Sequence, residues 1–293
     1  MITVPAKDFS LRATLECGQA FRWRPAPTGY YGFIGGCAVK ARQDGETLLI
    51  DTADSRLTAE HVSRYFALDL DLSPIRAAID VDSQIHDAIT QFPGLRILRQ
   101  DSWECLASFI LSSFNNIKRI QGMIDRLCQV YGEPVSYNGF RGCSFPAPEQ
   151  IAGVPERRLR ELGLGFRAPY LRDTAQLIAE GRMPLDMLRR TEYRVTKSSL
   201  LRCAGVGDKV ADCVALFGFE KYEAFPIDLW MERVMRYYFG RRRMTPKRIH
   251  DFATRHFGRY AGYAQQYLYH YARNARQRGE SAASSVERRA YSV

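Results

Sequence analysis

The hydrophobic pattern of this chain changes its period near residue 57, and this change restricts the fold more than any other feature. Before it lie four short runs rich in aromatic or β-branched residues, separated by the turn signals P-T-G, G-G and D-G. The runs cover residues 20–26, 29–35, 37–43 and 46–52. Short runs between such turns are typical of antiparallel strands.

After residue 57, apolar residues recur at steps of three and four, which is the period of an amphipathic helix. This spacing predicts helices over 103–113, 117–131, 168–180, 228–239 and 261–276. Glycine and proline interrupt it at Gly94, at 132–134 and over 139–155, which we expect to be loops. The predicted fold class is α+β, with a small antiparallel sheet followed by a mostly helical body.

The pattern also predicts the domain organisation. We expect a β domain over residues 1–80, a helical region over 81–278 with two lobes around a cleft, and a flexible tail over 279–293. The tail is small, polar and charged without periodic apolar residues. With 46% apolar residues, a chain of 293 residues can bury a sizeable core.

Several classes of protein are disfavoured. The sequence has no run of eighteen apolar residues and no signal-peptide order at its start, so we expect a soluble intracellular protein, cytoplasmic or nucleoid-associated if bacterial. Its seven cysteines form no C-x-x-C pair and its five histidines show no ligand spacing. We therefore expect reduced thiols and no metal or iron–sulfur site.

The charge balance indicates a partner that carries phosphate. Lys and Arg number 42 against 32 Asp and Glu, a net charge of +10. The excess is clustered in three groups: Arg157, Arg158 and Arg160; Arg241, Arg242, Arg243, Lys247 and Arg248; and Arg273, Arg276 and Arg278. Solvated helix faces would produce the same runs, so the charge alone does not decide between these interpretations.

The stretch from 198 to 217 has the pattern of a helix-hairpin-helix. One helix ends near Ala204, Gly205-Val206-Gly207 forms a tight turn, and a second helix begins at Asp208. The glycines permit positive φ and close approach, so the N–H groups of the turn could hold a phosphate. Many helical hairpins close in the same way without a ligand.

Lys209 lies in the first turn of that second helix, where the macrodipole disfavours a cation. Its neighbours Val206, Val210 and Cys213 are apolar, so we expect a depressed pKa for Lys209, although Asp208 acts in the opposite sense. A neutral lysine is a nucleophile that can form a Schiff base. The alternative is a lysine that only extends to solvent at a helix start.

Asp228 follows Pro226-Ile227 and precedes the helix predicted to begin near Leu229, so it is expected to be the N-cap. A cap carboxylate also faces the mouth of its helix. There it could stabilise a cationic sugar or accept a proton. Together with Lys209 it would suit the breaking of a glycosidic bond.

Several stretches resemble one known family. C-A-G-V-G-D-K-V-A-D-C at 203–213, followed by F-P-I-D at 225–228, is similar to the helix-hairpin-helix "GPD" DNA glycosylases. Four more stretches resemble the 8-oxoguanine DNA glycosylase/AP lyases of the eukaryotic type, which also occur in bacteria. They are E-C-G-Q-A-F-R-W (16–23), S-S-F-N-N-I-K-R-I (112–120), R-E-L-G-L-G-F-R-A-P-Y (160–170) and Y-A-G-Y-A-Q-Q-Y-L-Y (260–269). The resemblance spans nearly the whole chain.

The resemblance implies a base excision repair enzyme that acts on damaged double-stranded DNA. Lys209 would be the Schiff-base nucleophile and Asp228 the catalytic carboxylate. The damaged nucleotide would be flipped out of the duplex, excised opposite cytosine, and the strand then cut by β-elimination. No cofactor would be required, although hairpin carbonyls at Gly205, Val206 and Gly207 could hold a monovalent or other hard cation. We expect a monomer.

The resemblance also implies two further groups of residues. The carbonyl of Gly18 would accept N7–H of 8-oxoguanine, Gln265 would bind the Watson–Crick edge, and Cys213 and Tyr269 would cover the two faces of the base. Without the resemblance, Cys213 and Tyr269 would be interpreted as core residues. The second group would fill the duplex and hold the opposite cytosine: Phe114, Asn115, Asn116, Arg119, Arg160, Phe166 and Arg167. Phosphate contact or plain exposure is the alternative for the arginines.

Three departures from the family pattern broaden the expected base preference. Phe114 replaces the usual first of three asparagines, Tyr269 replaces phenylalanine, and Trp230 stands where the family tends to have histidine. Two other functions remain open at this stage. One is an alkylated-base glycosylase, which typically uses the aspartate without a lysine, and the other is a non-catalytic helix-hairpin-helix DNA-binding module.

Overall fold

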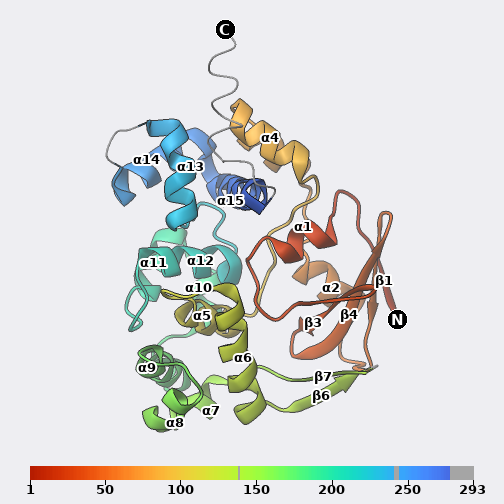
Figure 1. The fold of residues 1–293 in the computed structure, drawn as a ribbon, viewed down its shortest axis with the longest axis vertical. Coiled ribbons are helices and arrows are strands. Elements are labelled where there is room, and N and C mark those ends of the chain that lie inside the picture. Colours follow the sequence, from red (N-terminus) through yellow and green to blue (C-terminus); the bar gives the residue numbers. More distant parts are fainter. Residues whose placement is uncertain (138, 241–243, 278–293) are drawn as a thin grey trace.

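The computed structural model of the chain describes residues 1–137, 139–240 and 244–277. The predicted tail at 279–293 and the basic residues Arg241, Arg242, Arg243 and Arg278 lie outside the described residues. Within those ranges, no helix has the length and apolar character to cross a membrane. Figure 1 shows an N-terminal sheet beside a larger helical body.

The N-terminal part is a five-stranded antiparallel sheet in the order β1-β5-β4-β3-β2. Its strands are β1 (Ile2–Pro5), β2 (Arg24–Ala26), β3 (Gly29–Ile34), β4 (Cys37–Asp44) and β5 (Thr47–Asp51). Gly35 and Gly36 link β3 to β4 with φ of +55° and +80°, as a two-residue hairpin turn requires. Three predicted strands are thereby confirmed in type and place.

The prediction of a strand over residues 20–26 is wrong for its first half. Only Arg24–Ala26 pairs in the sheet. Phe21 leaves the sheet and packs against Phe109 of the helical body at 5.4 Å between ring centroids. Burial of this ring against a distant helix outweighs the local strand pattern. Strand β1 and helix α1 (Leu11–Glu16) were not predicted.

The helices that follow confirm the predicted fold class. Helices α5 (Ser102–Leu111), α6 (Ile117–Tyr131), α9 (Arg167–Ala179), α13 (Leu229–Phe239) and α15 (Ala261–Gln277) match the five predicted segments closely. The others are α2 (Ala59–Tyr65), α3 (Ser73–Ile79), α4 (Ser83–Gln91), α7 (Pro148–Ala152), α8 (Glu156–Glu161), α10 (Leu185–Arg189), α11 (Tyr193–Leu200), α12 (Asp208–Phe219) and α14 (Pro246–Phe257). The division of domains at residue 80 stays a prediction.

Part of the region predicted as loop, over 132–134 and 139–155, is regular structure. Strands β6 (Pro134–Tyr137) and β7 (Phe140–Cys143) form a hairpin, and helix α7 follows. Figure 1 shows this hairpin reaching from the base of α6 towards the sheet. Phe140 stacks on Tyr31 with ring centroids 5.0 Å apart and meets the edge of Phe33. This contact joins segments that are far apart in sequence, so the local pattern of glycine and proline does not reveal the hairpin.

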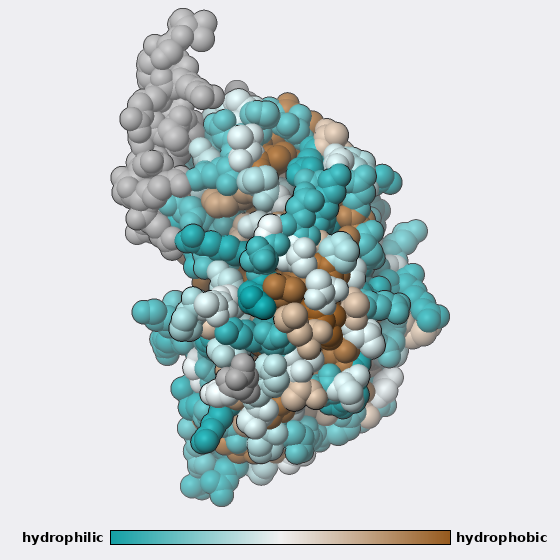
Figure 2. Space-filling view, turned by 90° about the vertical axis from the view of Figure 1, so that its right-hand side faces the viewer, coloured by the Kyte–Doolittle hydropathy of each residue, from teal (hydrophilic) through white to brown (hydrophobic). Residues whose placement is uncertain are grey.

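Two clusters of buried side chains divide the chain. One lies between the sheet and α2, with Val39, Ala41, Leu48 and Ile50 fully buried. The other fills the helical body from Leu72 onward and also takes in Ala13, Cys17 and Phe21 from the N-terminal part of the chain. The face on the side of the sheet is mostly hydrophilic, with a limited hydrophobic area near its middle (Figure 2).

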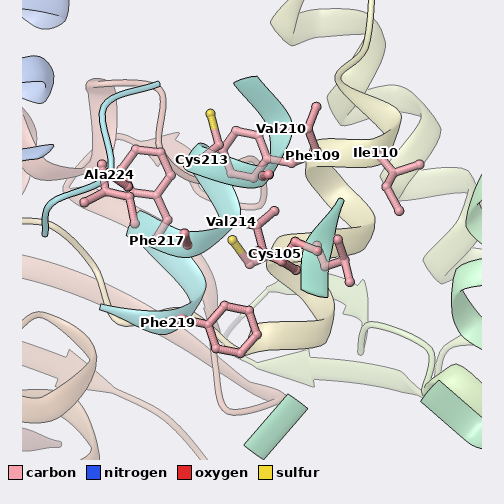
Figure 3. Close-up of a cluster of buried hydrophobic side chains, with 14 of the residues drawn as sticks. Cys105, Phe109, Ile110, Val210, Cys213, Val214, Phe217, Phe219 and Ala224 are labelled. Atoms are coloured by element: carbon pink, nitrogen blue, oxygen red, sulfur yellow. The ribbon is translucent and has the colours of Figure 1, made fainter. Parts of the chain in front are cut away.

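Helix α12 lies deep in the helical body. Every residue from Val210 to Phe219 is buried. Figure 3 shows Phe109 and Ile110 of α5 close to Val210 and Val214 of α12. Because this helix is enclosed along nearly all of its length, only its first turn meets the surface, and that turn carries Lys209.

A buried carboxylate fixes the position of α12. Asp212, with a side chain 1% exposed, accepts hydrogen bonds from Tyr193 Oη (2.6 Å) and Lys197 Nζ (3.0 Å) of α11. Nε2 of His250, on α14, lies 3.2 Å from Asp212 Oδ2, the oxygen that also accepts from Lys197. The carboxylate therefore joins both helices of the hairpin to α14. Its partners compensate for the cost of burying the charge.

Substituting Asp212 by alanine should destabilise the protein, because it leaves Lys197 and His250 without their buried partner. We expect the free energy of unfolding to fall by about 3 to 5 kcal/mol, measured by urea denaturation. Asp251→Ala removes only a surface partner of Lys247 and serves as the control, with no measurable change expected. Equal stability of the two variants would contradict this role.

Candidate active site

One pocket brings together the first turn of α12, the start of α13, the residue after α1 and the middle of α15. It is lined by all six residues predicted for the catalytic and damaged-base sites: Gly18, Lys209, Cys213, Asp228, Gln265 and Tyr269. Five more lining residues were not predicted: Cys17, Phe109, Phe217, Pro226 and Gln266. Their roles follow from contacts between segments that are far apart in sequence.

The hairpin turn positions Lys209. Gly205 has φ +76°, and a Cβ on it would lie 2.3 Å from the ring of Tyr170, so no other residue fits there. Gly207 is the N-cap of α12 and leaves Lys209 in its first turn. The predicted helix-hairpin-helix is thus confirmed in its geometry.

The amine of Lys209 has no counter-ion among the residues that the structure describes. Its Nζ lies 5.3 Å from the centre of the Phe109 ring and forms no ion pair with any described residue. Asp208, its neighbour in sequence, instead lies 3.2 Å from Lys197 Nζ. The negative charge of Asp208 therefore acts on Lys197 as well as on Lys209.

Asp228 caps helix α13, as predicted. Its Oδ1 accepts the backbone N–H groups of Trp230 (3.0 Å) and Met231 (2.9 Å). Both cap bonds use the same oxygen, and Oδ2 accepts no hydrogen bond from the described residues. The cap therefore fixes the carboxylate while one oxygen stays available to the pocket.

The other ionisable side chains of the pocket are uncharged near neutral pH. Burial raises the pKa of Cys17 and of Cys213 to about 11, and it raises the pKa of Tyr269 to about 12. All three therefore keep their protons below pH 9. Lys209 and Asp228 remain as the lining side chains able to act as nucleophile, acid or base.

Gly18 is held in a conformation that favours glycine. Its φ is +84°, and a Cβ would lie 3.1 Å from Arg273 Nη1 and 3.4 Å from the Tyr269 ring. Gln266 donates to the Cys17 carbonyl at 2.9 Å. Gln19 on the other side donates to the carbonyls of Thr14 and Arg96, both at 2.8 Å. Two buried glutamines thus fix the backbone that presents Gly18.

Gln265 carries an unsatisfied buried group. The side chain is 4% exposed, and Oε1 has no hydrogen-bond partner among the described residues. Buried amide oxygens are normally paired, so an orphan that lines a pocket indicates a ligand with donors on its edge. The pocket itself measures about 50 Å³, well below the volume of most ligand sites. A planar ligand would therefore have to displace side chains as it enters.

The predicted opposite-base residues lie on the α5–α6 and α8–α9 connections. Phe114 is 97% exposed and Phe166 is 45% exposed. Asn116 caps α6 by accepting from Arg119 N, and Asn115 donates to the Leu111 carbonyl at 3.3 Å. These two asparagines therefore support the turn between α5 and α6.

The three predicted arginines differ in their surroundings. Arg119 is exposed, and the exposed Arg160 lies 2.6 Å from Glu156 on the same helix. Arg167 is buried, and its guanidinium donates to the carbonyls of Ser113 and Phe114. The resemblance places all three arginines in one group, and burial distinguishes Arg167 from the other two.

The described residues contain no group of three or more His, Cys, Asp and Glu arranged to hold a metal ion. The cation expected at the hairpin carbonyls stays a prediction.

Comparisons with known proteins agree with this geometry. Residues 1–106 match the N-terminal domain of 8-oxoguanine DNA glycosylase, and residues 107–257 match the HhH-GPD superfamily of base excision DNA repair proteins. A probable N-glycosylase/DNA lyase of Methanothermobacter thermautotrophicus is 30% identical over 93% of this chain and 96% of its own length. The N-glycosylase/DNA lyase of Saccharomyces cerevisiae is 31% identical over 80% of this chain and 69% of its own.

Solved structures give the same result. An 8-oxoguanine glycosylase/lyase of Clostridium acetobutylicum, bound to double-stranded DNA with cytosine opposite 8-oxoG, is 33% identical with a TM-score of 0.87. The match covers 92% of this chain and 93% of that one. A 3-methyladenine DNA glycosylase of Archaeoglobus fulgidus has a TM-score of 0.78 at 20% identity, which is a likeness of fold.

The burial of the thiols generates a prediction for their reactivity. Thiol reagents attack the thiolate, and burial raises the pKa of Cys128 to about 12 as well as those of Cys17 and Cys213. At pH 8 the native protein should react rapidly at Cys143 alone, the one half-buried cysteine of the seven. Denatured protein should react at all seven. Rapid modification of Cys213 in the native state would contradict the closed, apolar pocket.

Proposed function

The chain belongs to the HhH-GPD superfamily of base excision DNA repair proteins and shares the N-terminal domain of the 8-oxoguanine DNA glycosylases, and on this premise we propose how its pocket works. It is a bifunctional N-glycosylase/DNA lyase for 8-oxoguanine opposite cytosine in duplex DNA. The observation that supports our assignment of residues is the shared pocket. It holds the amine of Lys209, which forms no ion pair with a described residue, a capped carboxylate at Asp228 and the orphan amide oxygen of Gln265.

We propose that Lys209 is the nucleophile. The target nucleotide is flipped out of the duplex, because its C1′ cannot be reached inside the stack. The lone pair of neutral Nζ forms a bond to C1′, the bond from C1′ to N9 breaks, and the base leaves with that electron pair and takes up a proton. The free oxygen of Asp228 stabilises the positive charge that develops on the sugar.

The lyase step follows from the same covalent intermediate. The bond from C1′ to the ring oxygen then breaks, and the ring oxygen keeps the electron pair and takes up one proton that Nζ releases. Loss of the second Nζ proton leaves a Schiff base between Nζ and C1′. A proton is then removed from C2′, and the 3′ phosphate departs with the electron pair of its C–O bond. Base release and strand cleavage therefore share one nucleophile.

We propose that pocket residues around Gly18 recognise the damaged base. 8-Oxoguanine carries a proton on N7 that guanine lacks, and the Gly18 carbonyl would accept it. Guanine would place its N7 lone pair against that carbonyl and leave a buried acceptor unsatisfied, at a cost of about 1 to 3 kcal/mol. Gln265 would bind the Watson–Crick edge, with Cys213 and Tyr269 on the two faces.

The remaining proposals concern the contacts with DNA, the oligomeric state and the location of the protein in the cell. Arg160, which is exposed, and Arg167 would offer donors to the opposite cytosine, with the exposed Arg119 in the same group, while the turn at 205–207 would approach a phosphate. All of the proposed pocket belongs to one chain, so we expect a monomer to suffice. Because the substrate is chromosomal DNA, we expect the enzyme to act inside the cell, at the nucleoid if the source is a bacterium.

The two other functions are less well supported. An alkylated-base glycosylase typically uses the aspartate without a lysine, so it does not account for Lys209 in the pocket. The similarity to the 3-methyladenine enzyme is one of fold. A non-catalytic DNA-binding module leaves the orphan oxygen of Gln265 and the shared position of Lys209 and Asp228 unexplained.

Borohydride reduction tests the nucleophile. The native protein should become covalently trapped on duplex DNA that contains 8-oxoguanine, whereas Lys209→Gln should give no trapped complex. Lys247→Gln, which removes an exposed lysine paired with Asp251, should trap as well as the native protein. Asp228→Asn should lower the rate of base release by at least about 100-fold. Full trapping by Lys209→Gln would overturn the assignment.

A second prediction separates recognition from chemistry. Gly18→Ala adds a Cβ to a left-handed backbone, and this Cβ would lie 3.1 Å from Arg273 Nη1 and 3.4 Å from the Tyr269 ring. We expect excision of 8-oxoguanine to fall by at least about tenfold. Trapping on DNA with a preformed abasic site should persist, because no base then needs to be read. Equal loss of both activities would indicate a folding defect, which thermal unfolding would detect.

A further inference from the structure

We propose that Arg273 binds O8 of the flipped 8-oxoguanine and stabilises the negative charge that the base acquires as it leaves the sugar. The inference rests on the proposed function, because it concerns the base that the same pocket would hold. It is carried by an unpaired nitrogen of Arg273, by the position of this side chain next to Gly18, and by the spacing of three residues along α15.

One nitrogen of Arg273 is buried without a partner. Nη1 forms no hydrogen bond with any described residue. The guanidinium keeps its charge throughout the ordinary pH range. Buried donors are normally paired, and burying part of a cation without a partner costs free energy. An unpaired donor at the wall of a cavity therefore indicates a ligand that presents an acceptor, just as the orphan oxygen of Gln265 indicates a ligand with donors.

The described side chains around Arg273 do not supply a counter-ion. Glu16 is the one carboxylate among the described residues that line the cavity beside Arg273. It pairs instead with Arg12 at 3.1 Å and accepts from Tyr30 Oη at 2.7 Å. Burial, together with the charge of Arg273, lowers the pKa of His270 to about 4, so this ring is neutral at pH 7. Arg273 is therefore the one cation among the described residues that line this cavity.

Arg273 lies against the residue that is proposed to read the damaged base. A Cβ on Gly18 would lie 3.1 Å from Arg273 Nη1, so the guanidinium and the Gly18 backbone are neighbours. Gly18 lines both the active pocket and a second cavity, of about 260 Å³, that Arg273 lines. The guanidinium thus stands beside the small active pocket and next to open space. This space allows it to adjust its position to a base that enters.

The spacing along α15 aligns Arg273 with two residues that are proposed to hold the base. Gln265, Tyr269 and Arg273 follow one another at steps of four, so they lie along one face of the helix. Eight residues of helix span about 12 Å, a length that accommodates a purine with a hydrogen bond at each end. With its Watson–Crick edge at Gln265, the base directs its imidazole edge, which carries N7 and O8, towards Gly18 and Arg273.

The imidazole edge of 8-oxoguanine has a donor and an acceptor side by side, N7–H and O8. Gly18 offers a carbonyl and Arg273 offers an N–H, so the two neighbours complement this edge. When the bond from C1′ to N9 breaks, its electron pair enters the base and is shared between N9 and O8 through C8. The hydrogen bond from the guanidinium to O8 strengthens as this charge develops, and the base then takes up a proton. Guanine has C8–H and an unprotonated N7, so it gains neither hydrogen bond.

Single-turnover release of the base at saturating protein tests the inference. Arg273→Leu should lower the rate for 8-oxoguanine by at least about tenfold, because a charged donor to the leaving base is lost. Arg182→Leu removes an exposed arginine that pairs with Glu180 after the end of α9. It serves as the control and should keep the native rate. A native rate in Arg273→Leu would overturn the inference.

A change of one atom in the substrate isolates the contact with O8. 8-Thioguanine keeps the N7 proton, and its sulfur is a weaker hydrogen-bond acceptor than oxygen. The ratio of the rates for 8-oxoguanine and 8-thioguanine should be at least about threefold larger for the native protein than for Arg273→Leu, because the variant has no donor to lose. Differences in the leaving ability of the two bases cancel in this comparison. Equal ratios would show that Arg273 does not contact O8 and would overturn the inference.

Thermal unfolding separates the inference from a folding defect. Arg273→Leu should unfold at a temperature no lower than that of the native protein, because leucine replaces a partly buried charge that has no partner among the described residues. A clear fall in the unfolding temperature would show that the guanidinium holds the fold together, and it would overturn the inference.

Borohydride trapping separates the inference from the proposed function. On DNA with a preformed abasic site, Arg273→Leu should be trapped as fast as the native protein, since no base leaves there. If the native protein neither releases 8-oxoguanine nor becomes trapped, the proposed function fails. If the native protein does both, and Arg273→Leu loses trapping as much as base release, only the role of Arg273 at O8 fails.

Discussion

The packing of α12 against α5 and α11 is the constraint on which the rest of the structure depends. The helix is buried from Val210 onward, and Asp212 joins it to α11 and α14 through charged partners. Its first turn is consequently fixed at the surface, together with Lys209. A lysine placed at the end of a mobile segment could not be kept opposite a carboxylate from another helix. Here Asp228 is fixed separately by its own capping bonds.

Several polar groups are only partly used in the hydrogen bonds and ion pairs of the fold. In each case, the atom or group that the proposed chemistry requires is the one left over. Asp228 uses one oxygen as a helix cap and leaves the other available. Gln266 binds the Cys17 carbonyl, whereas its neighbour Gln265 has an unpaired oxygen in the pocket. Asp208 pairs with Lys197, and Lys209 forms no ion pair within the described part of the chain. Leaving each of these groups without a partner costs free energy, which a bound nucleotide would offset.

Much of this arrangement could be predicted from local sequence patterns. The helical period, the Gly205-Val206-Gly207 turn and the Asp228 cap depend on neighbours within a few residues, so the sequence indicates them directly. The β6–β7 hairpin, the departure of Phe21 from the sheet and the pocket roles of Phe109 and Gln266 depend on contacts across the whole chain. Arg167 illustrates the limit most clearly. Its sequence neighbourhood suggests an exposed donor, and only the fold shows that it is buried against Ser113 and Phe114.

The central claim is that one amine, Lys209, bonds to the sugar from which the base departs. Its most direct test is to digest the borohydride-reduced complex with protease and nuclease and to locate the sugar remnant by mass spectrometry. The account predicts the remnant on the peptide that contains Lys209 and on no other. A remnant on Lys197, on the N-terminal amine or on any other lysine would contradict it.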